Sequence, residues 1–254
     1  MIDKEKMMGY VRKQLAIDYN CSPDDFLKEG LVFTEAVQLE GRRPFPWRSP
    51  RIEMVTMGGS VIINASADIM PYVRKQFISM IRDEVFYMPF FYGINAYFLP
   101  DVDSITLSLK HDGFVYETLE RQDIAHLHKL KGFENALKYH PCPVEIVCLA
   151  KHNGKIIGMA GVSADCEMLW SVGVDVISSY SGKGVATTLV NMLTIEVLNR
   201  GFIPYYYASG NNIASQHVAI KAGYTPAWRH TYKAMLESNS ILSKVKDNLR
   251  KSLK

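Results

Sequence analysis

The sequence lacks the features that mark several large classes of protein. It has no apolar run of about 18 residues, so no membrane-spanning segment is predicted. Its first residues, MIDKEKMMGYVRKQ, are charged throughout and lack the apolar stretch of a secretory signal. The formal charge of +3 is too small to indicate nucleic acid as an obligate partner. We therefore expect a cytoplasmic protein that acts without a membrane or a nucleic acid.

Cysteine is also scarce, and its spacing excludes two further classes. The four cysteines form no CxxC pair and have no metal-like spacing with histidine. We expect reduced, buried thiols and no metal site. The cysteines are Cys21, Cys142, Cys148 and Cys166.

What is present is a chain of 254 residues, 48% hydrophobic and 22% charged, which is enough for one large domain or two small ones. In the first part, the residue spacing predicts a helix up to about residue 20 and a short helix capped by Ser22. Two strands are expected around a Gly58-Gly59 turn, followed by a helix that becomes regular at Pro71. ITLSLKHDGFVYETLERQDI is expected to supply a strand pair. No motif in this part indicates any chemistry.

The second part shows a sharper alternation of strands and helices, and we place the domain boundary between residues 111 and 112. VEIVCLAKHNGKIIGMAGVSA reads as two strands joined by an Asn153-Gly154 turn. EMLWSVGVDV is another strand, and a helix then runs until Gly201. FIPYYYA is a buried-looking strand, residues 213–222 form a short helix, and YTPAWRHTYKAML forms a last strand. The pattern predicts an α/β domain with a mixed sheet.

The stretch YSGKGVATTLVNML places two glycines directly before an apolar helix. The first amides of a helix have no internal partner and carry partial positive charge, so this arrangement suits a bound anion. Gly182 and Gly184 let a phosphate approach the main chain. Lys183 adds a charge, and Thr187 or Thr188 adds a hydroxyl. The alternative is that the glycines only form a tight turn.

Two common phosphate-binding patterns are excluded at this loop. The Walker A pattern requires Gly-Lys-Ser/Thr, whereas Gly182-Lys183-Gly184 is followed by Val185. The dinucleotide pattern G-x-G-x-x-G fails because Thr187 stands where the third glycine belongs.

Two segments instead resemble the GNAT superfamily of acetyl-CoA-dependent N-acetyltransferases. The family segment V-x-P-x-x-[QR]-x-x-G-x-[GA] reads VISSYSGKGVA from Val176 to Ala186. The family segment N-x-x-[AS]-x-x-x-[YA]-x-K-x-G-[FY] is read from Asn212 to Tyr224. Both occur in the family's order, with a strand hairpin upstream and a strand between them. The resemblance covers roughly residues 113–235, and GMAGVSADCEMLWSVGVDV resembles bacterial members that carry an extra N-terminal half.

The resemblance implies a mixed-sheet α/β catalytic domain at residues 112–254, preceded by a smaller α+β domain of unknown role at residues 1–111. It implies that acetyl-CoA lies along a strand that splays from its neighbour, with its pyrophosphate on the loop amides. An N–H near Val176 would polarise the thioester carbonyl. The residues implied to bind the coenzyme are Val174, Val176, Ser181, Gly182, Lys183, Gly184, Val185, Ala186, Thr187, Asn212 and Ser215.

The sequence departs from the family at three positions. Ser178 replaces a common proline, which is expected to matter little. Ser181 stands where Gln or Arg is usual, which is expected to weaken phosphate binding but not to remove it. Ala219 stands where many relatives carry a tyrosine that protonates the departing thiolate. An acid would then come from elsewhere, and Tyr207, Ser215 and Tyr224 are the candidates.

The sequence offers several carboxylates near the splayed strand as the general base and does not decide between them. An amine acceptor must lose a proton to attack, commonly to a carboxylate directly or through water. Asp175 interrupts an apolar strand, which indicates either a base or a structural hydrogen bond. Glu167 and Asp165 precede the strand, where a carboxylate is often only solvated.

The function expected from this resemblance is transfer of an acetyl group from acetyl-CoA to an amine by direct attack in a ternary complex. The acceptor is expected to be a small molecule or a peptide. The N-terminal domain would close over the acceptor or support a homodimer. The alternatives are a non-catalytic acetyl-CoA sensor, and a transferase for another acyl group or for a hydroxyl acceptor.

Overall fold

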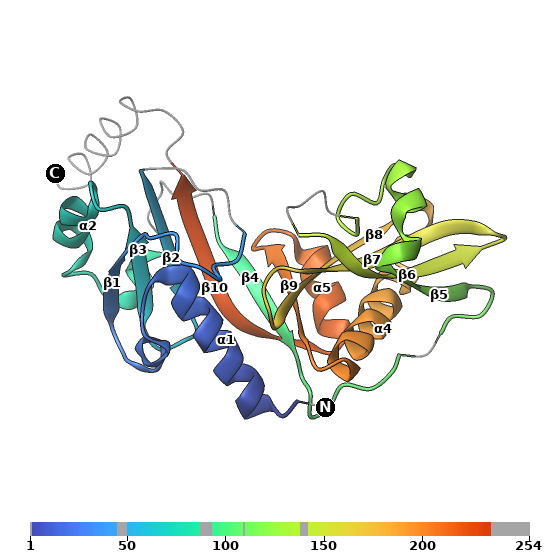
Figure 1. The fold of residues 1–254 in the computed structure, drawn as a ribbon, viewed down its shortest axis with the longest axis horizontal. Coiled ribbons are helices and arrows are strands. Elements are labelled where there is room, and N and C mark those ends of the chain that lie inside the picture. Colours follow the sequence, from blue (N-terminus) through green and yellow to red (C-terminus); the bar gives the residue numbers. More distant parts are fainter. Residues whose placement is uncertain (1, 45–49, 87–92, 109, 138–141, 235–254) are drawn as a thin grey trace. The chain divides into compact units, whose positions relative to one another are not determined.

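The computed structural model describes residues 2–44, 50–86, 93–108, 110–137 and 142–234 (Figure 1). The chain divides into two compact units, each built from segments distant in the sequence. The first comprises Met1–Val11 and Ala96–Ala227, and the second comprises Arg12–Asn95 and Trp228–Lys254. The boundary suggested by the sequence, between residues 111 and 112, lies inside the first unit. None of the described helices is long and apolar enough to cross a membrane.

The first unit contains a mixed sheet. Its strands are β4 (Asn95–Pro100), β5 (Val115–Glu120), β6 (Val144–His152), β7 (Lys155–Ala164), β8 (Leu169–Val176) and β9 (Ile203–Ser209). They lie in the order β4-β9-β8-β7-β6-β5, in which β5 to β8 form an antiparallel meander. β9 is parallel to β8, so the connection between them must cross over the sheet, and helix α4 (Val185–Asn199) provides it.

Local signals in the sequence place the turns and helix ends of this unit correctly. Asn153 and Gly154 both have positive φ, 50° and 74°, as the tight hairpin between β6 and β7 requires. Gly201 (φ 85°) follows α4, and Gly223 (φ 96°) follows helix α5 (Ile213–Lys221). Short 3-10 turns, η2 (Arg121–Asp123) and η3 (Ala125–Lys129), lie between β5 and β6.

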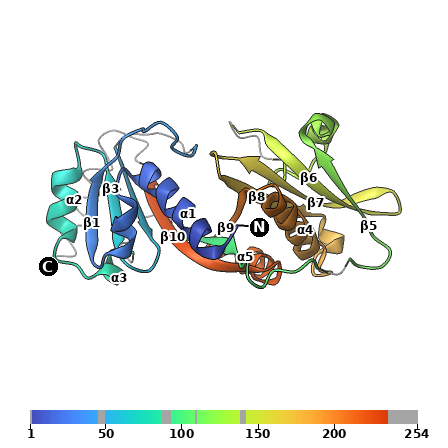
Figure 2. The same cartoon turned by 60° about the horizontal axis from the view of Figure 1, so that its bottom comes forward.

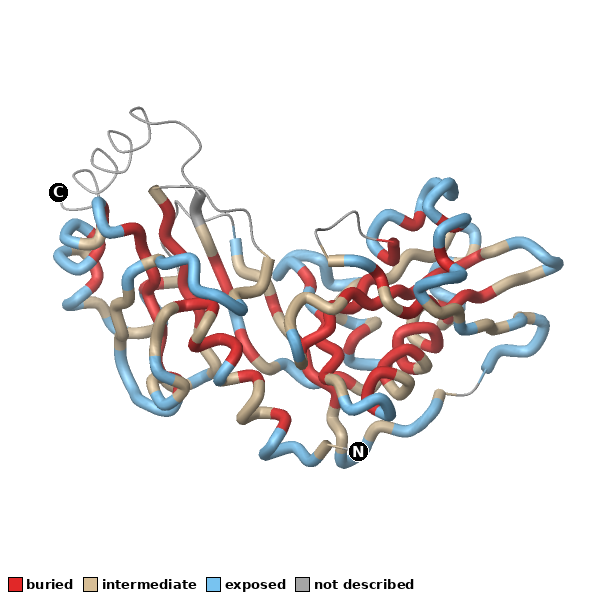
Figure 3. Tube along the Cα trace, viewed as in Figure 1, coloured by how far each residue is buried: buried red, intermediate tan, exposed pale blue. Residues whose placement is uncertain are grey.

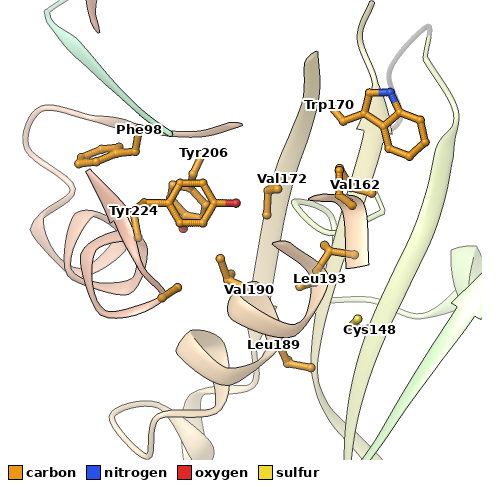
Figure 4. Packing of buried hydrophobic residues seen from close by; sticks show 14 of the residues in the cluster. Phe98, Cys148, Val162, Trp170, Val172, Leu189, Val190, Leu193, Tyr206 and Tyr224 are labelled. Atoms are coloured by element: carbon orange, nitrogen blue, oxygen red, sulfur yellow. The ribbon is translucent and has the colours of Figure 1, made fainter. Parts of the chain in front are cut away.

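Helix α4 supplies the centre of the first unit's core. It lies against β6, β7 and β8, as Figure 2 shows. Leu189, Val190, Leu193 and Val197 are buried completely, and Figure 4 shows the first three directed at the sheet. Buried positions accordingly run along α4 and the strands that it covers (Figure 3). Burial of these side chains holds the glycine loop in front of α4 in a fixed position.

The second unit is a smaller α+β assembly. It contains β1 (Leu31–Glu35), β2 (Arg51–Thr56), β3 (Val61–Ala65), most of β10 (Tyr224–Ala234), half of α1 (Lys4–Tyr19), η1 (Pro23–Leu27), α2 (Met70–Phe77) and α3 (Arg82–Val85). The strand order is β1-β3-β2-β10, with β1 parallel to β3 and the other neighbours antiparallel.

The two faces of this second sheet are covered differently. On one face, Ile52 and Met54 of β2 pack in a cluster with Val73 and Phe77 of α2. On the other face, the Asn64 amide donates a hydrogen bond of 2.9 Å to the carbonyl of Tyr19, the last residue of α1. The alternation of side chains along β2 and β3 separates these two environments.

Three sequence predictions require correction. The expected strand pair around residue 111 contains only β5, because residues 105–108 take no strand conformation. The helix expected to become regular at Pro71 is split, since Ile81 has an extended backbone and its N–H donates a hydrogen bond to the Glu84 carboxylate, at the start of α3. The helix capped by Ser22 is a 3-10 helix of five residues, although its capping box with Asp25 is present.

Charged side chains gather on the α1 face of the second sheet. Glu53 of β2 forms ion pairs with Arg42, at 3.1 Å, and with Arg51. The Nε2 atom of His230 lies 3.5 Å from the same carboxylate. All four side chains are buried. Burial, and then the nearby arginines, lower the pKa of His230 to about 3, so this imidazole is neutral and Glu53 compensates the two guanidinium charges.

Candidate functional site

The two parallel strands β8 and β9 separate in the middle of the first unit's sheet. Their pairing extends as far as Val172 and Tyr206. β8 then continues to Val176 and β9 to Ser209, without further pairing between them among the described residues. β8 keeps its antiparallel partner β7 to its end. The opening leaves one edge of β8 available to a ligand that can pair as a strand does.

A pocket of about 670 Å³ occupies this opening. It is lined by the separated ends of β8 and β9, by the loop before α4 and by the start of α5. Most residues that the family resemblance assigns to the coenzyme lie here. These are Val174, Val176, Ser181, Gly182, Gly184, Val185, Ala186, Thr187, Asn212 and Ser215.

The amino terminus of α4 has the geometry of an anion site. Gly184 is its N-cap residue, has φ 78°, and makes no side-chain hydrogen bond to the helix. The helix therefore begins without a side-chain cap over its first amides, and the residues of its first turn line the pocket. Gly184 has a positive φ that favours glycine, and a Cβ there would lie 2.5 Å from Nε2 of the exposed His111, whose ring would have to move.

Lys183 is the one residue of the implied binding set that does not line the pocket. Its Nζ lies 4.8 Å from the centre of the Tyr180 ring. The Tyr180 hydroxyl is in turn 2.7 Å from Nδ1 of His152. The ammonium is thus held beside the loop, where it adds positive charge to the anion site through space.

The start of α5 brings two hydroxyls together at the pocket. Asn212 is the N-cap, and its Oδ1 accepts a hydrogen bond of 3.1 Å from the Ser215 amide. The Ser215 hydroxyl lies 2.8 Å from that of Tyr206, on β9. Burial raises the pKa of Tyr206, so its phenol keeps its proton. Both residues line the pocket.

The carboxylate of Asp175 faces a loop and not the open pocket. Its Oδ2 accepts hydrogen bonds from the amides of Asn135 (2.7 Å) and Ala136 (2.9 Å). Its Oδ1 accepts another from the Asn135 side chain, at 2.6 Å. The structure therefore places Asp175 where it holds Asn135, a pocket residue, against β8. Of the two alternatives for Asp175, this geometry favours the structural hydrogen bond.

The other two residues suggested for catalysis lie away from the pocket lining. Glu167 is exposed in the bend before β8. Tyr224 is buried, with its hydroxyl 2.5 Å from Oγ1 of Thr194, and burial raises its pKa. Ala219 is also fully buried, in the core cluster. Asp165 accepts a hydrogen bond of 2.5 Å from Tyr205.

Sequence reasoning missed two residues at this site. His111 packs on Gly184 from beyond the domain boundary, and Asn135 reaches the pocket through its hydrogen bonds to Asp175. Tyr206 is one of three successive tyrosines that the sequence offers as possible pocket residues, but its neighbour Tyr207 was the one suggested as an acid. Strand alternation was the available signal, because Tyr206 shares the Val172 side of the sheet in the parallel register.

We expect Asp175→Asn to lower the free energy of unfolding by about 1 to 2 kcal/mol, because an amide nitrogen cannot accept the hydrogen bonds that the carboxylate accepts. Urea unfolding of this variant, beside the exposed Asp103→Asn as control, would measure the loss. Loss of turnover with unchanged stability would instead identify Asp175 as a base.

The fold and pocket define an α/β protein in which two parallel strands separate beside the amino terminus of a helix. Residues 112–224 match the model of the Acetyltransferase (GNAT) family, and this part of the chain is a GNAT acetyltransferase domain. The family resemblance of the two sequence segments is thereby confirmed.

Solved structures give partial similarities at low identity. A GNAT-family protein of Novosphingobium aromaticivorans has a TM-score of 0.42 and 19% identity over 55% of this chain and 63% of its own. A GCN5-related N-acetyltransferase-like protein of Streptococcus suis has a TM-score of 0.44 and 15% identity over 70% and 72%. Salmonella typhimurium yncA, described with its cofactor acetyl-CoA, has a TM-score of 0.36 and 13% identity over 51% and 98%. The chain thus spans less than two thirds of the Novosphingobium protein. Comparison with curated proteins gives no match.

Proposed function

We propose that the GNAT domain transfers an acetyl group from acetyl-CoA to an amine by direct attack in a ternary complex. The observation that carries this proposal is that one pocket combines the opening between β8 and β9 with the uncapped amino terminus of α4. A ligand that fits both needs an anionic group at one end and an extended, amide-containing arm at the other. Coenzyme A has this composition.

Different residues of the pocket bind different parts of acetyl-CoA. The main-chain amides from Gly182 to Thr187 hold the pyrophosphate. The free edge of β8, at Val174 and Val176, pairs with the amides of the pantetheine arm in the manner of an added strand. A main-chain N–H at this edge stabilises the oxyanion that forms on the thioester carbonyl.

Calorimetry tests the binding part of this proposal. We expect coenzyme A and acetyl-CoA to bind, and pantetheine, which lacks the pyrophosphate, to bind more weakly. Weaker binding follows because the α4 amides then have no anion to neutralise. If the protein binds none of the three ligands, the proposal is wrong.

Release of the coenzyme thiol tests catalysis. The protein is mixed with acetyl-CoA and a panel of polyamines, aminoglycosides, amino acids and short peptides, and free thiol is followed. Propionyl-CoA and succinyl-CoA in parallel distinguish a transferase for a longer acyl group, and alcohols distinguish a hydroxyl acceptor.

A non-catalytic acetyl-CoA sensor is the second candidate function. It is favoured by Ala219, which is fully buried and carries no hydroxyl at the position of the usual acid. Binding by calorimetry together with no thiol release across the whole panel would support this function over transfer.

A further inference from the structure

We propose that the hydroxyl of Tyr206 donates a hydrogen bond to the sulfur of coenzyme A as the thioester breaks, with Ser215 positioning that hydroxyl. This inference deepens the proposed function and rests on it. Many relatives carry a tyrosine acid at the position of Ala219, which has no hydroxyl in this chain. The inference gives a residue of β9 the role of stabilising the departing thiolate.

Tyr206 stands at the point where the strands separate. It is the last residue of β9 that pairs with β8, and it lines the pocket. The arm of the coenzyme runs from the α4 amides toward this point, because its phosphates and its sulfur lie at opposite ends of the arm. The sulfur therefore reaches the neighbourhood of Val172 and Tyr206.

The other hydroxyls of the pocket are placed differently. Ser181, in the loop before α4, and Thr187, in the first turn of α4, lie where the phosphates are proposed to bind. Ser209 donates a hydrogen bond of 2.6 Å to Asn211 at the end of β9. Tyr207 points to the opposite face of the sheet, where its ring stacks on Tyr97 at 5.4 Å. The Tyr180 hydroxyl, in the segment before α4, lies 2.7 Å from Nδ1 of His152. Among the described pocket residues, Tyr206 and its partner Ser215 remain.

The Tyr206–Ser215 pair is arranged to direct a hydroxyl proton toward the sulfur. The two oxygens are 2.8 Å apart, and either one can donate. When Ser215 donates to Tyr206, the phenolic proton is left for a third atom in the pocket. The Asn212 cap holds the backbone of Ser215, and the tyrosine ring is buried against that of Tyr224, with 6.1 Å between ring centres.

The chemical step balances without a change of charge on the tyrosine. The amine lone pair forms the C–N bond, the C–S bond breaks, and its electron pair stays on sulfur as a thiolate. The proton of the attacking amine passes to solvent. Burial places the pKa of the phenol above its ordinary value, and the thiol pKa is near 8.5, so Tyr206 keeps its proton and stabilises the thiolate by a hydrogen bond.

The test measures the thiol pKa of bound coenzyme A, from thiolate ultraviolet absorbance against pH, and needs no acceptor. In the wild-type protein, we expect this pKa to lie about one to two pH units below that of free coenzyme A. Tyr206→Phe should return it to the value of the free coenzyme while binding persists. Ser215→Ala should give a smaller rise, because the phenol remains but is less well oriented.

Tyr224→Phe is the matched comparison, since it removes another buried hydroxyl from the same core. A rise in the thiol pKa with Tyr224→Phe and none with Tyr206→Phe would overturn the inference in favour of the residue suggested by the sequence. Equal pKa values in wild type, Tyr206→Phe and Ser215→Ala would also overturn it, while normal coenzyme binding would leave the proposed function intact. If Tyr206→Phe does not fold, Ser215→Ala decides the question by itself.

Once an acceptor is known, turnover provides a second measurement. Tyr206→Phe should lower kcat by about 10- to 100-fold with little change in the KM for acetyl-CoA, because the hydrogen bond is made in the transition state. A raised KM at constant kcat would contradict a role in bond breaking.

Discussion

Replacing Gly182 with aspartate is expected to weaken binding of coenzyme A by about a hundredfold, or about 3 kcal/mol. Gly182 lines the pocket in the loop before α4, and a Cβ there would meet no atom within 4 Å. The new carboxylate would therefore fit, and it would stand against the pyrophosphate at the amino terminus of the helix. Repulsion between these charges opposes the attraction of the main-chain amides. Calorimetry with coenzyme A measures the change.

The matched control for this experiment is Gly182→Asn. The backbone at Gly182 has φ 77°, and asparagine and aspartate tolerate this region to a similar degree. The comparison isolates the charge, and the asparagine variant should keep most of the affinity. Gly184 is a less suitable probe, because a side chain there would also displace the His111 ring. Equal affinities for the Asp and Asn variants would show that no phosphate lies on this loop.

Glu53→Gln is expected to lower the free energy of unfolding by about 3 to 4 kcal/mol. The substitution preserves the shape of the side chain but removes its charge. Arg42 and Arg51 would then remain in a buried environment without the carboxylate that both contact, and the neutral His230 cannot compensate them. Urea unfolding followed by circular dichroism measures the loss.

Glu120→Gln is the control, because it removes the same charge from an ion pair that is exposed to solvent. Glu120 also pairs with an arginine, at 2.6 Å from Arg200, but its side chain is 42% exposed. A solvated ion pair contributes little, so the expected loss is below about 1 kcal/mol. Similar losses in both variants would contradict the view that burial makes the Glu53 cluster sensitive.

Local signals explain why much of the GNAT domain could be predicted from the sequence. A turn such as Asn153-Gly154, and a helix end such as Gly201, depend on the backbone preferences of one or two residues. The loop with Gly182 and Gly184 depends in the same way on positive φ and on the helix that follows. Such features need no knowledge of distant partners.

Features that depend on distant partners were predicted less well. The sequence presents Asp175 as an acid in an apolar strand, and only the fold shows that residues 135 and 136 donate to it. Glu167 and Tyr224 are close to the motifs in sequence, yet one is solvated and the other is enclosed in the core. Closeness along the chain does not determine which way a side chain faces.

The sequence by itself determined the family, the glycine loop before α4 and the order of elements around it, because each follows from residues close together in the chain. The tertiary structure decided where β8 and β9 separate and that the Tyr206 hydroxyl stands at that point. It also decided that the Asp175 carboxylate accepts hydrogen bonds from a loop. It also decided that the units are built from discontinuous segments. The physical reason is that strand pairing and burial join residues far apart in sequence, so that the Ser215 hydroxyl on α5 meets the Tyr206 hydroxyl on β9 only after the chain has folded.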